Sequence, residues 1–348
     1  MMMLLLAGVA ACAGLFLGVV GGFAVRERAR RWVPGLRRDA HRGALPPSDR
    51  GPQERRGASV DRTDAMSTLD ARVPATSRIY DYLLGGKDNF AVDRHFADQV
   101  TEVFPPAAAG ARANRRCLRR MVRYLSERGI RQFLDIGCGL PASPNVHEIA
   151  QQIAQGSRIV YIDNDPLVAV HARALMADPA HRRGVTFHRV DLRDPTSILA
   201  AARQTLDFSR PIGLLLFAVL HHLPDTNAAL DAVRRLVAEL PTGSPVALSH
   251  ATYDKLPGAL RTNLDLLIEA GALRGQFQAR SRDQVTAFLS GLDLIDPGLL
   301  SAARWRPGSV PHASGGVSEA GAICYVGVAV KRGGAGRGRT GAAFELSP

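Results

Sequence analysis

The chain has 348 residues, of which 46% are hydrophobic, which is ordinary for a globular protein and allows one large domain or two small ones. Of the formal net charge of +12, residues 1–65 contribute +5 and residues 331–348 contribute +3, so the part between them is only mildly basic and does not demand a nucleic-acid partner. The four cysteines are far apart and form no C-x-x-C pair, which argues against a zinc site or a disulfide framework and favours a reducing, cytoplasmic setting.

Residues 1–25 form an uncharged, apolar segment long enough to span a bilayer, and an arginine-rich segment follows it at 26–31. This arrangement predicts a transmembrane anchor with the rest of the chain in the cytoplasm, since positive charge marks the cytoplasmic side. Residues 26–65 are rich in Pro, Gly, Arg and Asp, which predicts a disordered basic linker. The alternative interpretation is that translation begins at Met66 and that residues 1–65 are not made.

The first element expected in the core is an amphipathic helix over residues 111–128. Its arginine face consists of Arg112, Arg115, Arg116, Arg119, Arg120 and Arg123, and its apolar face of Cys117, Leu118, Met121, Val122 and Leu125. Such an arginine face is typical of a solvated surface, and binding of phosphate or RNA is the alternative.

The segment QFLDIGCGL at 132–140 has the pattern of a buried strand that leads into a nucleotide-binding loop. An apolar run ends in Asp135 and then turns through Gly137 and Gly139, where a side chain would block the approach of a ligand to the backbone. The segment RIVYIDND at 158–165 repeats the pattern, and Asp163 can accept hydrogen bonds from both hydroxyls of a ribose. Together the two segments predict a site for an adenosine-containing cofactor.

Two cofactors compete for this site. The run from Gly137 to Ala142 fits the G-x-G-x-x-A fingerprint of nicotinamide enzymes. Pro141 argues against a dinucleotide, because a pyrophosphate would be held by free N–H groups at the start of the following helix and proline removes one of them. S-adenosyl-L-methionine has no phosphate, so the sequence favours it.

Apolar runs alternate with helical patterns through the rest of the chain. They predict strands at 131–136, 158–163, 185–190, 212–219, 245–250, 292–295 and 323–330, and helices at 146–153, 228–240, 260–273 and 285–289. Continuous apolar strands with helices between them predict a doubly wound, Rossmann-like α/β sheet that is mostly parallel and ends in an antiparallel strand. We expect this domain over residues 66–331 and a disordered tail over 332–348.

Six runs share a pattern with a known family: PATSRIYDYLLGGKDNF at 74–90, RAN at 112–114, FLDIGCGLP at 133–141, NVHE at 145–148, YIDNDP at 161–166 and LHHLPD at 220–225. They resemble the actinobacterial S-adenosyl-L-methionine-dependent methyltransferases formerly catalogued as a domain of unknown function. The resemblance covers roughly residues 69–331, and the run YDYLLGGKDN at 80–89 is highly specific to the family. It implies the class I methyltransferase fold and no settled substrate. Cys138 is a small departure, since serine is common there.

The resemblance and the residues agree on the cofactor contacts. Asp135, Gly137 and Gly139 are expected beside the methionine part, Asp163 at the ribose hydroxyls and Asn164 beside the adenine.

Three further residues are assigned with an alternative open for each. Asp191 ends the third strand, where it could accept from the adenine amino group or cap the next helix. Arg78 and Tyr80 precede the sheet, and they could contact the cofactor carboxylate or the substrate. The alternative is that their segment only packs and that Gly85 and Gly86 end its helix.

Two adjacent histidines, His221 and His222, follow the fourth strand at the edge of the sheet where doubly wound folds bind ligands. One of them could act as a general base toward a substrate hydroxyl or amine. On an extended segment adjacent side chains point in opposite directions, so we expect no metal site from this pair. The alternative is one packed and one solvated histidine. The same two interpretations apply to His250, which ends the fifth strand.

The predicted activity is methyl transfer from S-adenosyl-L-methionine to an unidentified acceptor, expected to be a small molecule because no nucleic-acid motif is recognisable. The alternatives are an NAD(P)-dependent oxidoreductase and a non-catalytic regulator that binds S-adenosylmethionine. A reversed final strand would exclude the nicotinamide fold.

Overall fold

The computed structural model describes residues 69–177, 183–271, 273–306 and 323–333, all within one compact unit, Asp61–Pro348. The predicted anchor at 1–25, the linker at 26–65, the alternative start at Met66 and nearly all of the predicted tail lie outside these ranges. Among the described helices, none is long and apolar enough to cross a membrane.

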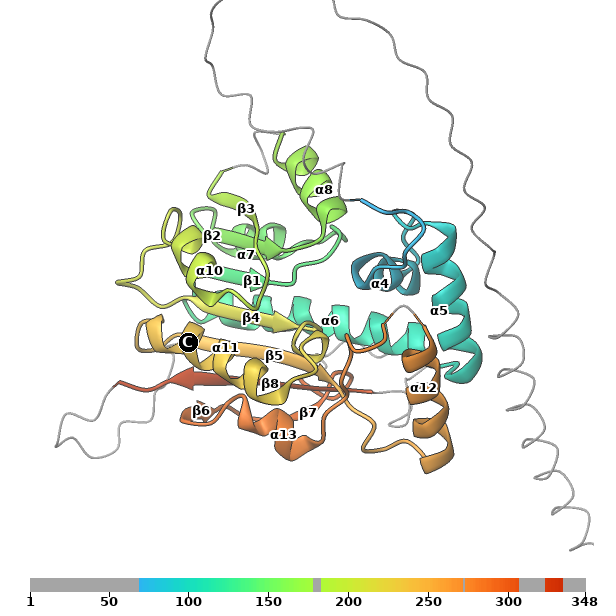
Figure 1. Ribbon diagram of the computed structural model, residues 1–348. Helices are drawn as coiled ribbons and strands as arrows, with labels where there is room; N and C mark the ends of the chain where they lie inside the picture. Colours follow the sequence, from blue (N-terminus) through green and yellow to red (C-terminus); the bar gives the residue numbers. More distant parts are fainter. Residues whose placement is uncertain (1–68, 178–182, 272, 307–322, 334–348) are drawn as a thin grey trace, which may run out of the picture. The chain divides into compact units, whose positions relative to one another are not determined.

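The described residues form one mixed sheet in the order β3-β2-β1-β4-β5-β8-β6, with β7 paired to β8 (Figure 1). The strands are β1 (Gln132–Ile136), β2 (Arg158–Asp163), β3 (Val185–Arg189), β4 (Gly213–Phe217), β5 (Pro245–Ala251), β6 (Leu292–Leu294), β7 (Leu300–Ser301) and β8 (Cys324–Lys331). Neighbours among β1 to β5 are parallel, whereas β8 is antiparallel to β5, β6 and β7. This topology confirms the predicted fold class.

The central strands are apolar on both sides because helices cover both faces of the sheet. On β1, Phe133 packs on one face, while Leu134 and Ile136 pack on the other. On the face with Phe133, the sheet is covered by α6 (Ala107–Glu127) and α7 (Val146–Ile153). The opposite face is covered by α10 (Pro195–Ala202), α11 (Thr226–Glu239) and α13 (Arg282–Ala287). Helix α8 (Pro166–Ala177) connects β2 to β3.

Three further helices lie beyond the carboxyl ends of the strands (Figure 1). They are α4 (Thr76–Leu84), α5 (Ala91–Val103) and α12 (Gly258–Ala270). Two small apolar clusters hold them together, one around Phe96 and Leu273 and one around Phe104 and Leu264. These clusters are separate from the cores on the two sheet faces, so the three helices form a cap over one edge of the sheet.

The segment after β4 differs from its prediction. The strand expected to reach residue 219 ends at Phe217, because Ala218 has a φ of 52° and turns the chain. Residues Leu220–His222 then form the 3-10 helix η1, where an extended segment was expected. The short strand β7 was not predicted, since two residues give no periodic signal.

Candidate functional site

A cavity of about 1250 Å³ lies between the cap helices and the carboxyl ends of β1, β2, β4 and β5. All ten residues predicted for the site line it: Arg78, Tyr80, Asp135, Gly137, Gly139, Asp163, Asn164, Asp191, His221 and His222. The strand register explains why Asp135 and Asp163 lie at the same edge of the sheet. Ile136 pairs with Ile162, so the parallel strands β1 and β2 end side by side.

The loop after β1 requires glycine for two different reasons. Gly137 and Gly139 have φ of 71° and 66°, a region that side chains disfavour. A Cβ on Gly137 would also lie 2.4 Å from Cγ2 of Val219, whereas one on Gly139 would meet nothing within 4 Å. The backbone N–H of Gly137 donates to the carbonyl of Ile162 at 2.8 Å, which ties the loop to β2.

Asp163 is buried, and its carboxylate joins the two strand ends. Oδ2 accepts from the N–H of Gly139 and Oδ1 accepts from the N–H of Asp165, each at 2.9 Å. Burial raises its pKa to about 6, although these backbone hydrogen bonds act in the opposite direction. A carboxylate can accept about four hydrogen bonds, so Asp163 keeps acceptor capacity for a ligand.

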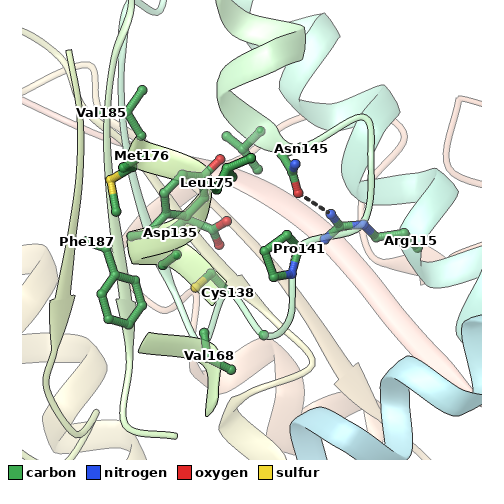
Figure 2. A pocket seen from close by; sticks show the side chains of 14 residues that line it. Arg115, Asp135, Cys138, Pro141, Asn145, Val168, Leu175, Met176, Val185 and Phe187 are labelled. Atoms are coloured by element: carbon green, nitrogen blue, oxygen red, sulfur yellow. Dashed lines mark hydrogen bonds between the residues drawn. The ribbon is translucent and has the colours of Figure 1, made fainter. Parts of the chain in front are cut away.

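Asp135 is 3% exposed, and no hydrogen bond joins its carboxylate to another residue in the described ranges. Burial raises its pKa to about 7, while Arg115 acts to lower it and Asp163 to raise it. The carboxylate also borders a second, small pocket of about 30 Å³, which Figure 2 shows together with Cys138 and Phe187. A buried carboxylate without a donor from the protein is a candidate partner for a cationic group of a ligand.

Asn164 follows β2 and Asp191 follows β3, and the two side chains contact each other. Asn164 Nδ2 donates to Asp191 Oδ2 at 2.8 Å, and Arg193 donates to both oxygens of Asp191 from its side chain and to Oδ1 from its backbone. The bonds from Arg193 are the main reason that the pKa of Asp191 falls to about 2. The helix cap that was the alternative role of Asp191 belongs to Asp194, whose side chain accepts from the N–H of Ser197.

The side chains of Arg78 and Tyr80 reach the cavity wall but have partners within the protein. Arg78 forms a buried ion pair with Asp93, with Nε 2.9 Å from Oδ2. The Tyr80 hydroxyl donates to the carbonyl of Ala111 and accepts from Nδ2 of Asn114, each at 3.1 Å. Burial raises the pKa of Tyr80 to about 12, which makes its phenol a poor source of a phenolate at neutral pH. The contact of either residue with a ligand stays a prediction.

The first half of the specific run at 80–89 ends α4, and the second half forms the turn that leads to α5. Gly85 has a φ of 87° and ends α4, as the packing alternative expected. Asp81 accepts from the N–H of Asp88 and from Nδ2 of Asn89, and a Cβ on Gly86 would lie 2.0 Å from Oδ1 of Asp81. The run therefore shapes the cap beside the cavity.

His221 and His222 lie side by side, with ring centroids 4.4 Å apart. The N–H of Ala251 donates to Nδ1 of His221 at 3.3 Å, and Nδ1 of His222 lies 3.3 Å from the carbonyl oxygen of Gln276. Burial lowers the pKa of His222 to about 4 and that of His221 well below its ordinary value. The expectation that the two rings point in opposite directions from an extended segment is wrong, because η1 turns the backbone between them.

Arg280 holds this turn in place and was not predicted. Its side chain is 1% exposed and donates to the carbonyl oxygens of Leu220, Leu223 and Pro224, to the hydroxyl of Thr226, and to Nε2 of His250. His250 lies within the sheet, and burial lowers its pKa to about 3. No sequence signal marks Arg280, since it is an isolated arginine whose partners lie 30 to 60 residues away.

The arginine face of α6 is divided. Arg112, Arg116 and Arg123 are exposed, as expected for a solvated face, but the other three arginines are half-buried. Arg115 and Arg119 donate to backbone carbonyls of the 142–143 loop, and Arg120 donates to the carbonyls of Ala302 and Trp305. The solvated-face interpretation is therefore wrong for half of the set, because the turn of α6 places these guanidinium groups over neighbouring backbone.

Two adjacent residues of α6 have buried polar atoms without a hydrogen-bond partner in the described structure. They are Oδ1 of Asn114 and Nε of Arg115, and both residues line the large cavity. Figure 2 shows the Arg115 guanidinium reaching Asn145, whose Oδ1 lies 3.4 Å from Nη2. Asn114 belongs to the RAN run quoted for the resemblance, which was its sequence signal.

The described residues contain no group of His, Cys, Asp and Glu that could hold a metal ion. The antiparallel strand β8 is the reversed strand that a nicotinamide fold would lack, so the oxidoreductase alternative is wrong.

Comparisons with known proteins agree with this geometry. The model of the S-adenosyl methyltransferase family matches residues 62–332. A DUF574 family protein from Streptomyces avermitilis is similar at 36% identity and a TM-score of 0.69, with 75% of this chain and 99% of that chain covered. A structure from Thermobifida fusca, described as a methyltransferase candidate, is similar at 32% identity and a TM-score of 0.68, with 79% and 100% covered. Curated proteins gave no match.

The family is defined by its cofactor and its reaction, so the chain is an enzyme that uses S-adenosyl-L-methionine to methylate an acceptor. The match covers the sheet, the cap and the whole cavity. The chain belongs to the S-adenosyl methyltransferase family.

Proposed function

We propose that the large cavity holds S-adenosyl-L-methionine along the ends of β1, β2 and β3, and a small-molecule methyl acceptor beside His221 and His222. The observation that supports this most is the pair of buried strand-end acids, Asp135 and Asp163, at one cavity wall with the glycine loop between them. When bound, the cofactor supplies a methyl group that is already activated on a sulfonium, so the protein mainly provides alignment and a dry site.

The ribose end of the cofactor fits Asp163. Its two oxygens already accept one backbone hydrogen bond each, which fixes the carboxylate and leaves acceptor capacity for the ribose hydroxyls. The same bonds hold the Gly139 loop against β2, so one residue would both shape the site and bind the ligand.

The amino-acid end of the cofactor fits Asp135, Asn114 and Arg115. An ammonium group could donate to the carboxylate of Asp135 and to Oδ1 of Asn114, which has no donor in the described structure. The carboxylate of the ligand could accept from Nε of Arg115, which is also buried without a partner. Each of these protein groups would thereby gain the hydrogen bond that it lacks.

The adenine end fits Asn164 and Asp191 only with a rearrangement. The four acceptor positions of Asp191 are occupied by bonds from Asn164 and Arg193. The Arg193 side chain is 70% exposed and can move away, so an adenine amino group would take its place. We assign Arg78 and Tyr80 to the walls of the site, since their polar groups already bond to Asp93 and to α6.

Calorimetry with S-adenosylhomocysteine tests this function on the full chain. We expect a dissociation constant in the micromolar range, which corresponds to about −8 kcal/mol. Asn114→Ala should weaken binding about tenfold, because a buried ionic hydrogen bond is worth about 1.5–3 kcal/mol, while Asn227→Ala on α11 should not. Absence of binding would refute the proposal.

We also propose that residues 1–25 tether the enzyme to a membrane, as their sequence predicts. The tethered protein should resist carbonate extraction from membranes. Mass spectrometry of the native protein decides, because a mature N-terminus at Met66 would eliminate the anchor.

A further inference from the structure

Backbone groups next to His221 and His222 determine which ring nitrogen of each histidine bears the proton. The N–H of Ala251 can only donate, so Nδ1 of His221 accepts and the proton of the neutral ring is on Nε2. The carbonyl oxygen of Gln276 can only accept, so Nδ1 of His222 donates and Nε2 holds the lone pair. His221 is thus a donor and His222 an acceptor, at adjacent positions.

A second set of hydrogen bonds behind the rings fixes the proton of His250. Arg280 donates to Nε2 of His250 at 2.9 Å, which leaves the His250 proton on Nδ1, 2.7 Å from the carbonyl oxygen of Ala251. The N–H of the same Ala251 is the group that donates to His221. Because a guanidinium has no acceptor and stays protonated, the proton of His250 remains on Nδ1, and the Ala251 N–H donates to His221 independently of it.

In each ring, Nε2 is the nitrogen left for a ligand. Within the described ranges no residue forms a hydrogen bond with Nε2 of His221 or of His222, and both residues line the cavity. The ring centroids are 4.4 Å apart, and on this proximity we base the inference that one small functional group contacts both nitrogens. Such a group must accept from His221 and donate to His222.

We infer that the methyl acceptor is a neutral, largely apolar small molecule that is methylated on a hydroxyl group held between His221 and His222. This inference rests on the proposed function. A hydroxyl both accepts and donates, as the pair requires. A carboxylate has no proton to donate, and an aliphatic amine is protonated at pH 7 and has no lone pair to accept with. An aromatic amine is a weak acceptor because its lone pair is delocalised into the ring, and a thiol is weak in both roles.

The surroundings of the two rings agree with a neutral acceptor. Phe277 lies beside both rings at 5.1 and 6.1 Å between centroids, and Tyr253 lies 6.4 Å from Phe277. None of the described cavity-lining residues from α5, or from Ala251 onward, is charged. The carboxylate nearest in sequence, Asp225, also lines the cavity, but it is exposed and accepts from backbone N–H groups at the start of α11. Apart from Asp225, the described residues of this wall offer no counter-charge to an ionised acid or a protonated amine.

The transfer is balanced without another reactant. The substrate oxygen forms a bond to the methyl carbon while the carbon–sulfur bond breaks and sulfur retains the electron pair. The hydroxyl proton passes to Nε2 of His222, so the positive charge moves from the sulfonium to the imidazolium. A base with a pKa of about 4 suffices, because an oxygen that has gained a methyl group is a much stronger acid than an imidazolium.

The first test reads the two tautomers without any turnover. Long-range ¹H–¹⁵N NMR spectra of the full chain with S-adenosylhomocysteine at pH 7 should show the proton on Nε2 of His221 and on Nδ1 of His222. The signals are assigned by their loss in His221→Gln and His222→Gln. A charged ring at this pH, or the reverse pair of tautomers, would overturn the inference.

The second test is methyl transfer to sets of compounds that differ only in the acceptor group, such as 2-naphthol, 2-naphthylamine, 2-naphthalenethiol and 2-naphthoic acid, with matching one-ring and alicyclic sets. We expect methyl ethers as the products. His222→Gln should lower kcat about 100-fold, as for loss of a general base. His221→Gln should mainly raise KM, about tenfold, as for loss of one hydrogen bond. The control His95→Gln, on the exposed side of α5, should change neither.

The outcomes separate this inference from the proposed function. Suppose that S-adenosylhomocysteine binds normally but that no hydroxyl compound is methylated, or that other acceptor groups are preferred. This result would refute the hydroxyl assignment and leave the proposed cofactor site unaffected. Loss of S-adenosylhomocysteine binding itself would count against the proposed function.

Discussion

Replacement of Asp163 by alanine tests the ribose assignment with a predictable magnitude. The carboxylate would lose its bonds to the two ribose hydroxyls, and each hydrogen bond to a charged group is worth about 1.5–3 kcal/mol. Loss of one bond already corresponds to about tenfold in affinity, since 1.4 kcal/mol is a factor of ten. The variant would also free the N–H of Gly139, which loosens the loop beside the ligand. We therefore expect at least a tenfold rise in the dissociation constant.

The fold should tolerate this change better than binding does. Burial raises the pKa of Asp163 to about 6, so the folded protein disfavours its charge at neutral pH relative to the unfolded chain. Removal of the carboxylate relieves that cost and offsets the lost bonds to Gly139 and Asp165. The ligand-free variant should accordingly melt close to the wild type.

Calorimetry with S-adenosylhomocysteine and a thermal melt without ligand measure the two effects. Asp207→Ala is a matched control, because Asp207 also accepts from the backbone N–H two residues later but precedes β4 and does not line the cavity. An Asp163→Ala protein that melts normally and binds within twofold of the wild type would refute the ribose role.

The remaining predictions concern the loop, the buried acid and the arginine face. Gly137→Ala should abolish cofactor binding, because the added Cβ would clash with the side chain of Val219. Gly139→Ala should only weaken binding, through backbone strain, because its Cβ would meet no atom. Equal losses of affinity in calorimetry would contradict this prediction. The pKa of Asp135 is about 7, so S-adenosylhomocysteine affinity should rise roughly tenfold from pH 6 to pH 8, while Asp135→Asn should show a flat profile. Over the same rise the ligand-free fold should lose stability relative to Asp135→Asn, since the stability that a raised folded-state pKa contributes is lost as the pH rises through that pKa, here about 7. Arg120→Ala should lower the melting temperature by roughly 4–8 °C, as for a loss of about 2 kcal/mol, and the exposed Arg123→Ala should not.

The sequence alone was sufficient to predict the sheet and to bring the candidate site residues to one cavity. Buried parallel strands are apolar over their whole length, and each acid at a strand end is followed by turn residues, so Asp135, Gly137 and Asp163 could be assigned from their immediate neighbours. Parallel strands end at one edge, which is why these local signals also placed the residues in one site. The family resemblance rested on the same runs.

The hydrogen-bond partners were decided only by the tertiary structure. The roles of His221 and His222 depend on Ala251 and Gln276, and the neighbouring His250 is held by Arg280, all far away in sequence. The arginine face of α6 has a regular pattern, yet the neighbouring backbone determines which of its members are buried. A periodic pattern indicates which side of an element faces inward, whereas the proton positions of His221 and His222 depend on atoms that only folding brings within hydrogen-bonding distance.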